Sequence, residues 1–440
     1  MAITLAGLGS FSHTSKHDVP NAGVLIAGGS SPSHSGRART TAPNTAGASS
    51  APRTPAETRL RSVLAKWLRA AGPDSGAFVY DLDASAPLFA LRARIKRPPA
   101  SVEKLYTTVA LMRTLGPNAR LHTAVLGTGR LVHGVWHGNL YLRGGGDPTF
   151  GDPTFNRVWE KGYGPTASQL VGQLAARGIT AVTGSVFADE SLFDRRRGGL
   201  MTDYAADVPD FGGQLSALTY DHGATTRRLS PALFAVKEFV LTLRGSHIRA
   251  KAAKHTATTP RRAHLLAIVN SPPMSVMTRL MDVPSDDLFA EMFTKQLGVL
   301  FGSGGTIAAG ARVIHGTIAG TYGLHPTILD GSGLSRDDAS SPLEIVDLLR
   351  GVWHTPTGGL LAGSLPTVGV NGTVQGIGLK TAAKGRCIAK TGTLDFVTNL
   401  AGYCRSRGGY ALAFALMIDG PENYTAILLE DRMIGAIAHY

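Results

Sequence analysis

Two apolar segments near the C-terminus place the strongest constraint on the fold. Residues 385–403 read GRCIAKTGTLDFVTNLAGY, and residues 409–420 read GYALAFALMIDG. Strands in which nearly every residue is apolar are buried on both faces, so they belong in the centre of a sheet. We therefore predict a hairpin that turns near Asp395 and Phe396, followed by a further central strand.

The length of the chain predicts more than one domain. The chain has 440 residues, which exceeds the size at which a single hydrophobic core usually suffices. Hydrophobic residues make up 43% and charged residues 17% of the sequence, which is typical of a globular protein. No run of 18 apolar residues occurs, so we expect no transmembrane segment.

The N-terminal segment has a different composition. Residues 29–56 consist mainly of Ser, Pro, Ala, Thr and Gly, with no aromatic residue and no aliphatic residue larger than alanine. Such a segment cannot bury a core, so we predict that residues 1–56 are a disordered segment and linker. The first residues, MAITLAGLGSF, lack a basic region and a full-length apolar region, so they make a poor signal peptide.

Net charge and metal-binding residues exclude some functions. The chain has 44 basic and 31 acidic residues, a balance of +13, but the basic clusters at 91–97 and 194–199 lack interleaved aromatic residues. We expect no nucleic-acid partner, and attraction to an anionic surface explains the charge equally well. Two cysteines cannot form a CxxC-type zinc site, and His133 and His137 lack a third ligand. We therefore expect no metal and no cofactor.

A serine and a lysine lie one helical turn apart in the segment PPASVEKLYTTVALMRTLG, residues 98–116. Pro98 and Pro99 suit the entry to a helix, and Gly116 suits its end. On such a helix Ser101 and Lys104 lie on one side, where a desolvated lysine can take the proton of the hydroxyl. The pattern S-x-x-K is short, however, and also arises by chance.

Two further motifs follow in the order expected for one class of enzyme. Ser285 is the second residue of PSDDLFAE, at a predicted helix start, and Lys390 begins the tripeptide Lys-Thr-Gly on a predicted strand. S-x-x-K, S-D-N and K-T-G together are the signature of penicillin-binding proteins and class A β-lactamases. Taken singly, Ser285 could instead cap the following helix, and Lys390 could mark an ordinary strand end.

With these motifs, the chain resembles the D-alanyl-D-alanine carboxypeptidases and endopeptidases of the low-molecular-mass penicillin-binding protein 4 type, serine peptidase family S13. The resemblance covers about residues 57–440. It rests on the segments PASVEKLYTT, GNLYLRGGGDPTF, ADESLFD, QLSALTYDHG, SPPMSVMTRLMDVPSDDLFAE, DGSGLSRDD and GRCIAKTGTLDFVTNLAGY. It implies an α+β fold, in which a transpeptidase-like domain with an antiparallel sheet flanked by helices is interrupted by a large mixed α/β insert. The first part of this domain would be 57–118, the insert 119–270 and the second part 271–440.

The resemblance also implies roles for individual residues. Ser101 would be the nucleophile, Lys104 would take its proton, and Ser285 would relay that proton to the departing D-alanine. The oxyanion would be held by the backbone N–H groups of Ser101 and Thr393. The substrate-binding residues would be Asp287, Lys390, Thr391, Gly392 and Thr393, and the substrate carboxylate would dock beside Lys390 and the hydroxyls of Thr391 and Thr393.

The implied partners are peptidoglycan stem peptides as substrates and β-lactam antibiotics as covalent inhibitors. The implied location is extracytoplasmic, in the periplasm or the cell wall, although the sequence carries no convincing export signal. Two other functions stay open: a catalytically weakened peptidoglycan-binding protein, and a β-lactamase-like hydrolase. No landmark for a deacylating base is found, which disfavours the β-lactamase.

One residue departs from the family pattern. The middle motif is Ser-Asp-Asp, so Asp287 stands where the family has asparagine. An ionised aspartate can only accept hydrogen bonds, and near Lys104 it would favour the charged ammonium over the free amine. We therefore predict an active but slow enzyme, with its optimum displaced towards alkaline pH.

The two cysteines flank the predicted hairpin. Cys387 and Cys404 would be direct neighbours across the two strands, at a separation that a disulfide tolerates. Free cysteine also packs readily as a small hydrophobic side chain. The sequence favours two free buried thiols over a disulfide.

Overall fold

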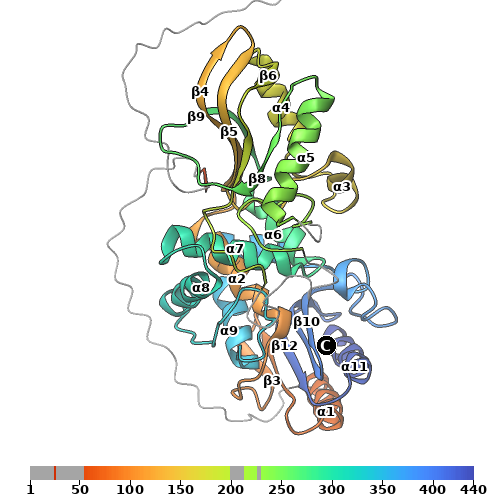
Figure 1. The fold of residues 1–440 in the computed structure, drawn as a ribbon. Coiled ribbons are helices and arrows are strands. Elements are labelled where there is room, and N and C mark those ends of the chain that lie inside the picture. The colour runs from red at the N-terminus through yellow and green to blue at the C-terminus, as the bar shows by residue number, and fades with distance from the viewer. Residues whose placement is uncertain (1–23, 26–53, 199–212, 225–228) are drawn as a thin grey trace, which may run out of the picture.

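The chain forms two β-sheets separated by a layer of helices, as the computed structural model shows (Figure 1). The structure describes residues 24–25, 54–198, 213–224 and 229–440. One sheet has five strands and the other has seven. The predicted α+β class is confirmed, since helices flank an antiparallel sheet and most of a second sheet is inserted between its strands in the sequence.

The five-stranded sheet joins strands from residues 76–91 to strands from residues 387–419. Every neighbouring pair is antiparallel, in the order β10-β11-β12-β2-β3. The strands β11 and β12 are internal, as their continuous apolar sequences predict. The bounds are β2 (Gly76–Asp81), β3 (Ala86–Leu91), β10 (Cys387–Leu394), β11 (Val397–Arg405) and β12 (Ala411–Asp419).

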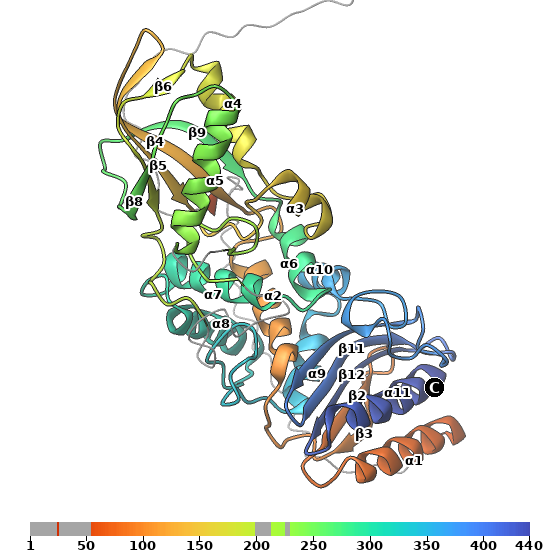
Figure 2. The same ribbon diagram turned by 45° about the vertical axis from the view of Figure 1, so that its right-hand side comes forward.

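Both faces of this sheet are covered. Along β12, Leu412, Phe414 and Leu416 belong to one core, and the alternating Ala413 and Met417 belong to another. Helices α1 (Pro55–Ala70) and α11 (Asn423–His439) lie side by side on the first face (Figure 2). Helix α9 (Pro342–Val352) packs on the second. Successive side chains of a strand point to opposite faces of the sheet. The large side chains of β12 therefore face α1 and α11, and mostly small ones face α9.

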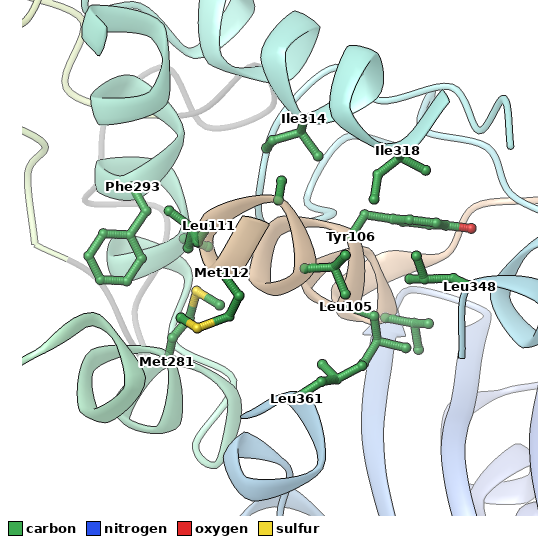
Figure 3. Close-up of a cluster of buried hydrophobic side chains, with 14 of the residues drawn as sticks. Leu105, Tyr106, Leu111, Met112, Met281, Phe293, Ile314, Ile318, Leu348 and Leu361 are labelled. Carbon is green, nitrogen blue, oxygen red and sulfur yellow. The ribbon is translucent and has the colours of Figure 1, made fainter. Parts of the chain in front are cut away.

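Helix α2 (Lys104–Thr114) lies at the centre of the helical layer. It follows the short 3-10 helix η1 (Ala100–Glu103), and all its residues from Lys104 to Met112 are buried. The sequence predicts one apolar face, but the helix is enclosed on all sides, since four other helices and the sheet surround it (Figure 3). The surrounding helices are α6 (Met274–Asp282), α7 (Asp287–Phe301), α8 (Ile307–Tyr322) and α10 (Pro356–Ser364).

The seven-stranded sheet is the centre of a second lobe, formed mainly by the described residues between 120 and 270. The long hairpin of β4 and β5 is flanked by antiparallel β9 and by parallel β6 and β7. Helices α4 and α5 share a core with this sheet, and short β1 pairs with β4. The bounds are β1 (Val24–Leu25), β4 (Arg120–Val132), β5 (Val135–Gly144), α3 (Pro153–Val158), α4 (Ala167–Ala176), β6 (Ala181–Val182), β7 (Val186–Asp189), α5 (Pro231–Gly245), β8 (Ala252–Thr256) and β9 (His264–Asn270).

The predicted linker lies mostly outside the described residues. Of residues 1–56, the structure describes only 24–25 and 54–56, and Pro55 already begins α1 with Thr54 as its N-cap. Within the described part of the chain, no helix is long and apolar enough to cross a membrane. In that same part, no group of three or more His, Cys, Asp or Glu side chains is arranged to hold a metal ion.

Candidate active site

Ser101 and Lys104 lie together at the entrance to the central helix. Ser101 is in η1, and Lys104 is the first residue of α2, three positions further on. The Lys104 Nζ donates a hydrogen bond to the Ser101 Oγ at 2.9 Å. Ser101 remains partly exposed, whereas Lys104 is completely buried. The hydroxyl is therefore accessible while its amine partner is shielded from water.

Two other groups hold the Lys104 ammonium. Its Nζ donates to the Asp287 Oδ1 at 2.5 Å and to the backbone carbonyl of Ser332 at 2.8 Å. The side chain of Asp287 thus lies against Lys104, as its position in the motif predicts. Ser332 belongs to the DGSGLSR segment, so this segment borders the site in addition to forming a glycine turn.

The turn between α6 and α7 presents the serine of the middle motif. Ser285 has a φ of 67°, and Asp286 is the N-cap of α7, its Oδ1 accepting from the Phe289 N–H at 2.9 Å. The interpretation of Ser285 as the helix cap is therefore wrong, because Asp286 takes that place. The Ser285 Oγ instead accepts a hydrogen bond from the Lys390 Nζ at 2.7 Å.

The edge strand β10 supplies the last motif. Lys390 is completely buried, and its Nζ also donates to the Thr391 carbonyl at 2.9 Å. The Thr391 hydroxyl hydrogen-bonds that of Thr373, and Thr393 is exposed. Gly392 is required here because a Cβ would lie 2.5 Å from the Pro99 carbonyl oxygen and 3.1 Å from the Ser101 nitrogen. The strand therefore runs directly beside the Ser101 turn.

Some positioning residues are missed by sequence reasoning. The Asn399 amide on β11 donates to the carbonyls of Pro98 and Pro99, both at 2.9 Å, and so fixes the chain before Ser101. Asp330 and Glu291 accept hydrogen bonds from backbone N–H groups of the turn that carries Ser332. A lone Asn inside an apolar strand was the available signal for Asn399, since buried amides need partners.

Burial controls the electrostatics of this region. Burial, followed by the charge of Lys104, lowers the pKa of Lys390 to about 7. Burial raises the pKa of Asp282, beneath the site, to about 6, and Asp282 accepts hydrogen bonds from Thr108 and Ser364. Burial and then Asp330 raise the pKa of Glu291 to about 8. Several of these groups therefore titrate near neutral pH, as expected of a low-dielectric site.

The site thus contains two serine–lysine pairs, and the hydroxyl of one pair belongs to the partly exposed Ser101. Ser101 pairs with Lys104, Ser285 pairs with Lys390, and Asp287 contacts the first lysine. A hydroxyl next to a buried amine is a nucleophile with an adjacent base. Its place at the start of a helix favours developing negative charge. This chemistry suits acyl transfer.

Comparison with known families agrees with the motifs. The model of the D-Ala-D-Ala carboxypeptidase 3 (S13) family matches residues 56–231 and 210–439. The chain belongs to this family. The predicted family, and with it the predicted serine-type D-Ala-D-Ala carboxypeptidase of the penicillin-binding class, is therefore confirmed.

Individual relatives extend the comparison. The chain is 32% identical over 401 residues to "Carboxypeptidase DacB" of Mycolicibacterium smegmatis, covering 85% of this chain and 83% of that protein. It is 25% identical over 457 residues to a D-alanyl-D-alanine carboxypeptidase of an Actinomadura species, covering 84% and 82%. The crystal structure of penicillin binding protein 4 from Haemophilus influenzae shares the fold, with a TM-score of 0.71 and 19% identity. That match covers 86% of this chain and 99% of that chain.

The two cysteines form a disulfide next to this site. Cys387 and Cys404 face each other across β10 and β11, in the predicted register. The preference for two free thiols is wrong, because the structure joins them. Cys387 and Cys404 are directly opposed residues of neighbouring strands, so their side chains lie within reach of a disulfide. The prediction of free thiols considered only how each cysteine packs by itself. The bond ties the strand of Lys390 to its neighbour.

Proposed function

We propose that the chain cleaves the terminal D-Ala-D-Ala bond of peptidoglycan stem peptides through an acyl-enzyme on Ser101. The single observation that carries this proposal is the hydrogen bond from the buried Lys104 Nζ to the hydroxyl of the partly exposed Ser101. Family membership supports the substrate class. A free Lys104 amine would accept the hydroxyl proton as the Ser101 oxygen attacks the scissile carbonyl carbon.

The next steps use the second pair. The carbonyl oxygen of the tetrahedral intermediate would be held by the N–H groups of Ser101 and Thr393, on the strand that Gly392 brings close to the turn. The proton would pass through Ser285 to the departing D-alanine amine, leaving the acyl group on Ser101. Water then attacks the ester and releases the shortened peptide and the free hydroxyl.

Recognition of the substrate carboxylate is assigned to β10. Lys390 would contribute positive charge, and Thr391 and Thr393 would contribute hydroxyl donors. The exposure of Thr393 and the contact of Lys390 with Ser285 support this assignment. The same groups would receive the carboxylate of a β-lactam, which would acylate Ser101 and block the enzyme.

We also propose where the enzyme acts and how its chain is divided into domains. Because the substrate lies outside the cytoplasmic membrane, we assign the enzyme to the extracytoplasmic space. We divide the chain into a first catalytic part at 57–118, an insert at 119–270 and a second catalytic part at 271–440. The start of β4 at Arg120 and the end of β9 at Asn270 support this division.

A fluorescent penicillin tests the nucleophile. Ser101→Ala should abolish both covalent labelling and D-alanine release, because the attacking oxygen is removed. The matched control is Ser62→Ala on the exposed surface of α1, which should label like the parent protein. Retained labelling or hydrolysis in Ser101→Ala would contradict the assignment.

A weakened peptidoglycan-binding protein is the second candidate function. One observation favours it: Asp287 holds Lys104 at 2.5 Å, which stabilises the ammonium that cannot act as a base. The labelling assay separates the candidates. Lasting acylation identifies the peptidase, rapid turnover of the label identifies a β-lactamase, and no labelling of the parent protein identifies the binder.

A further inference from the structure

His222, from the second lobe, contacts the serine–aspartate–aspartate motif directly. Its Nε2 lies 2.6 Å from the Asp286 Oδ2, and its ring packs on Phe289 of α7 with centroids 5.7 Å apart. The His222 side chain is only 14% exposed. His222 lies outside the three motifs S-x-x-K, Ser-Asp-Asp and Lys-Thr-Gly, and its contact joins the two lobes at Asp286, between Ser285 and Asp287.

The segment that carries His222 is anchored in the second lobe. Leu218 and Tyr220 belong to the core of the seven-stranded sheet, and the Thr219 hydroxyl donates to the Asp147 carbonyl at 3.1 Å. His222 itself has a φ of 58°, in the left-handed region that non-glycine residues adopt at a cost. The surrounding structure therefore holds the imidazole in one place.

Asp286 connects this imidazole to the reacting groups. Its Oδ1 caps α7 through the Phe289 N–H, while its Oδ2 takes the contact with His222. Both oxygens are thus occupied, which fixes the carboxylate and the backbone beside it. Ser285, which contacts Lys390, precedes Asp286, and Asp287, which contacts Lys104, follows it. A change at Asp286 therefore reaches both serine–lysine pairs.

The charged groups that act on the imidazole come from two elements. Burial alone would lower the pKa of His222, but the charge and hydrogen bond of Asp286, with the charge of Glu160, raise it above its ordinary value. Glu160 follows α3, and burial and then Asp286 raise its own pKa to about 8. Asp147 and Lys161 act on Glu160 in turn. His222 and Asp286 thus make a shielded contact beside the site, which is an ion pair whenever the imidazole is protonated.

We propose that His222 is a positioning residue that locks the serine–aspartate–aspartate motif in its active arrangement, and that the lock is strongest when the imidazole is protonated. The inference rests on the proposed acylation of Ser101 and adds a residue outside the three motifs. A charge-assisted hydrogen bond is roughly twice as strong as a neutral one. Protonated His222 therefore restrains Asp286 more tightly than neutral His222 does.

The sign of the pH effect follows from the direction of the shift. Because folding raises the pKa of His222, the stabilisation by the ion pair is complete below the ordinary value of the unfolded chain. It is lost as the pH rises through the raised value of the folded protein. The contribution of His222 to acylation should therefore be largest in mildly acidic solution and smallest in alkaline solution.

His222→Gln tests this dependence, because glutamine can still donate a hydrogen bond but carries no charge at any pH. The rate constant for acylation by a penicillin is measured for the full chain from pH 5.5 to 9. The ratio of parent to variant should be about fivefold at the acid end and fall towards one above the titration of His222. The control is His264→Gln. His264 is an exposed residue at the start of β9, so this variant should give a ratio near one over the whole pH range.

If the ratio of parent to His222→Gln acylation rate constants does not change with pH, the inference is overturned, even if the variant is less stable. A residue that only supports the fold would lower the rate by the same factor at every pH. Absence of labelling in the parent protein would instead contradict the proposed function. The two failures are therefore distinguishable.

A second measurement does not depend on the folding of that variant. The imidazole titration of His222 is followed by nuclear magnetic resonance in the parent protein and in Asp286→Asn. Asparagine keeps the helix cap but removes the charge. The midpoint should lie above that of an ordinary histidine in the parent and fall below it in the variant, where burial dominates. Equal midpoints would overturn the ion pair.

Discussion

At the residue scale, the unusual feature is a third charged group among the two serine–lysine pairs. Asp287 lies against Lys104 and is itself mostly buried. An asparagine would offer an N–H₂ donor to a substrate and its carbonyl to the lysine, whereas aspartate adds a full negative charge. Asp287 therefore lies close to Lys104, as its place in the motif predicts. The effect of its charge on the acylation rate can be measured.

Asp287→Asn should increase acylation by penicillin at pH 7 by about tenfold or more, because it removes the negative charge that lies 2.5 Å from the Lys104 Nζ and attracts the ammonium. Removing this attraction frees the amine to act as a base. The measurement is the acylation rate against pH, and the profile of the variant should shift towards lower pH.

Asp337→Asn is the matched control, since Asp337 is exposed on the loop that follows Ser332 and should leave the profile unchanged. Superimposable profiles for Asp287→Asn and the parent protein, or a slower Asp287→Asn variant, would show that the aspartate suits the enzyme's own substrate.

Lys390 gives a second pH dependence at this scale. Because burial lowers its pKa to about 7, the side chain is a cation below this pH and neutral above it. If its charge receives the ligand carboxylate, acylation by penicillin should fall, relative to acylation by the penicillin methyl ester, by about fivefold between pH 6 and 8. Identical pH profiles for acid and ester would exclude Lys390 as the carboxylate partner.

At the scale of elements, the close approach of β10 to η1 determines the geometry of the site. Gly392→Ala should displace either the strand or the Ser101 turn, because its Cβ would lie 2.5 Å from the Pro99 carbonyl oxygen. We expect a loss of penicillin labelling of at least about tenfold and a lower melting temperature, by analogy with overpacked cores that lose about 1–3 kcal/mol.

Gly359→Ala provides the contrast on α10, where a Cβ would meet nothing within 4 Å. Because Gly359 is an exposed position within a helix, this change should stabilise the protein by up to about 1 kcal/mol and leave labelling intact. A Gly392→Ala variant that labels normally would mean that strand and turn can separate without loss of the site.

The elements that could be predicted are those with a clear period or a clear end. The apolar segments gave the hairpin at Asp395 and Phe396 and the internal position of β11 and β12. The enclosure of α2 could not be predicted, because the Lys104, Thr107 and Thr108 side chains read as a polar face but are buried with partners from distant segments. Periodicity alone does not reveal such long-range contacts.

The candidate site was predictable where motifs carry it. The three motifs named residues that the structure brings together, and their order in the sequence sufficed. Asn399 and His222 could not be assigned in this way, since each acts on the backbone or carboxylate of another residue. The left-handed backbone of Ser285 also lay beyond prediction, because it results from how α6 and α7 are joined.

At the scale of the whole molecule, the disulfide is a direct test of the fold. Unfolded but unreduced protein should contain no free thiol, and reduced protein should contain two, one each from Cys387 and Cys404. With a sequence separation of 17, the bond should contribute about 3 kcal/mol to stability through the closed loop. Reduction should therefore lower the denaturation midpoint.

Cys404→Ala is the internal standard and should show one free thiol before reduction. Two thiols in the unreduced parent protein would mean that the cysteines are neighbours without being joined. That result would leave the strand register intact, since the register depends on the backbone pairing of β10 and β11.

The pairing of β12 with β2 sets the order in which the protein can become active. Ser101, the proposed nucleophile, is synthesised early, but the five-stranded sheet beside it is completed only when β10, β11 and β12 join β2 and β3. Until then, the edge of β2 that will receive β12 has no partner, and such edges invite association with other chains. A nascent chain therefore cannot acylate its nucleophile prematurely, and a chain truncated before β10 would carry Ser101 and yet be inert.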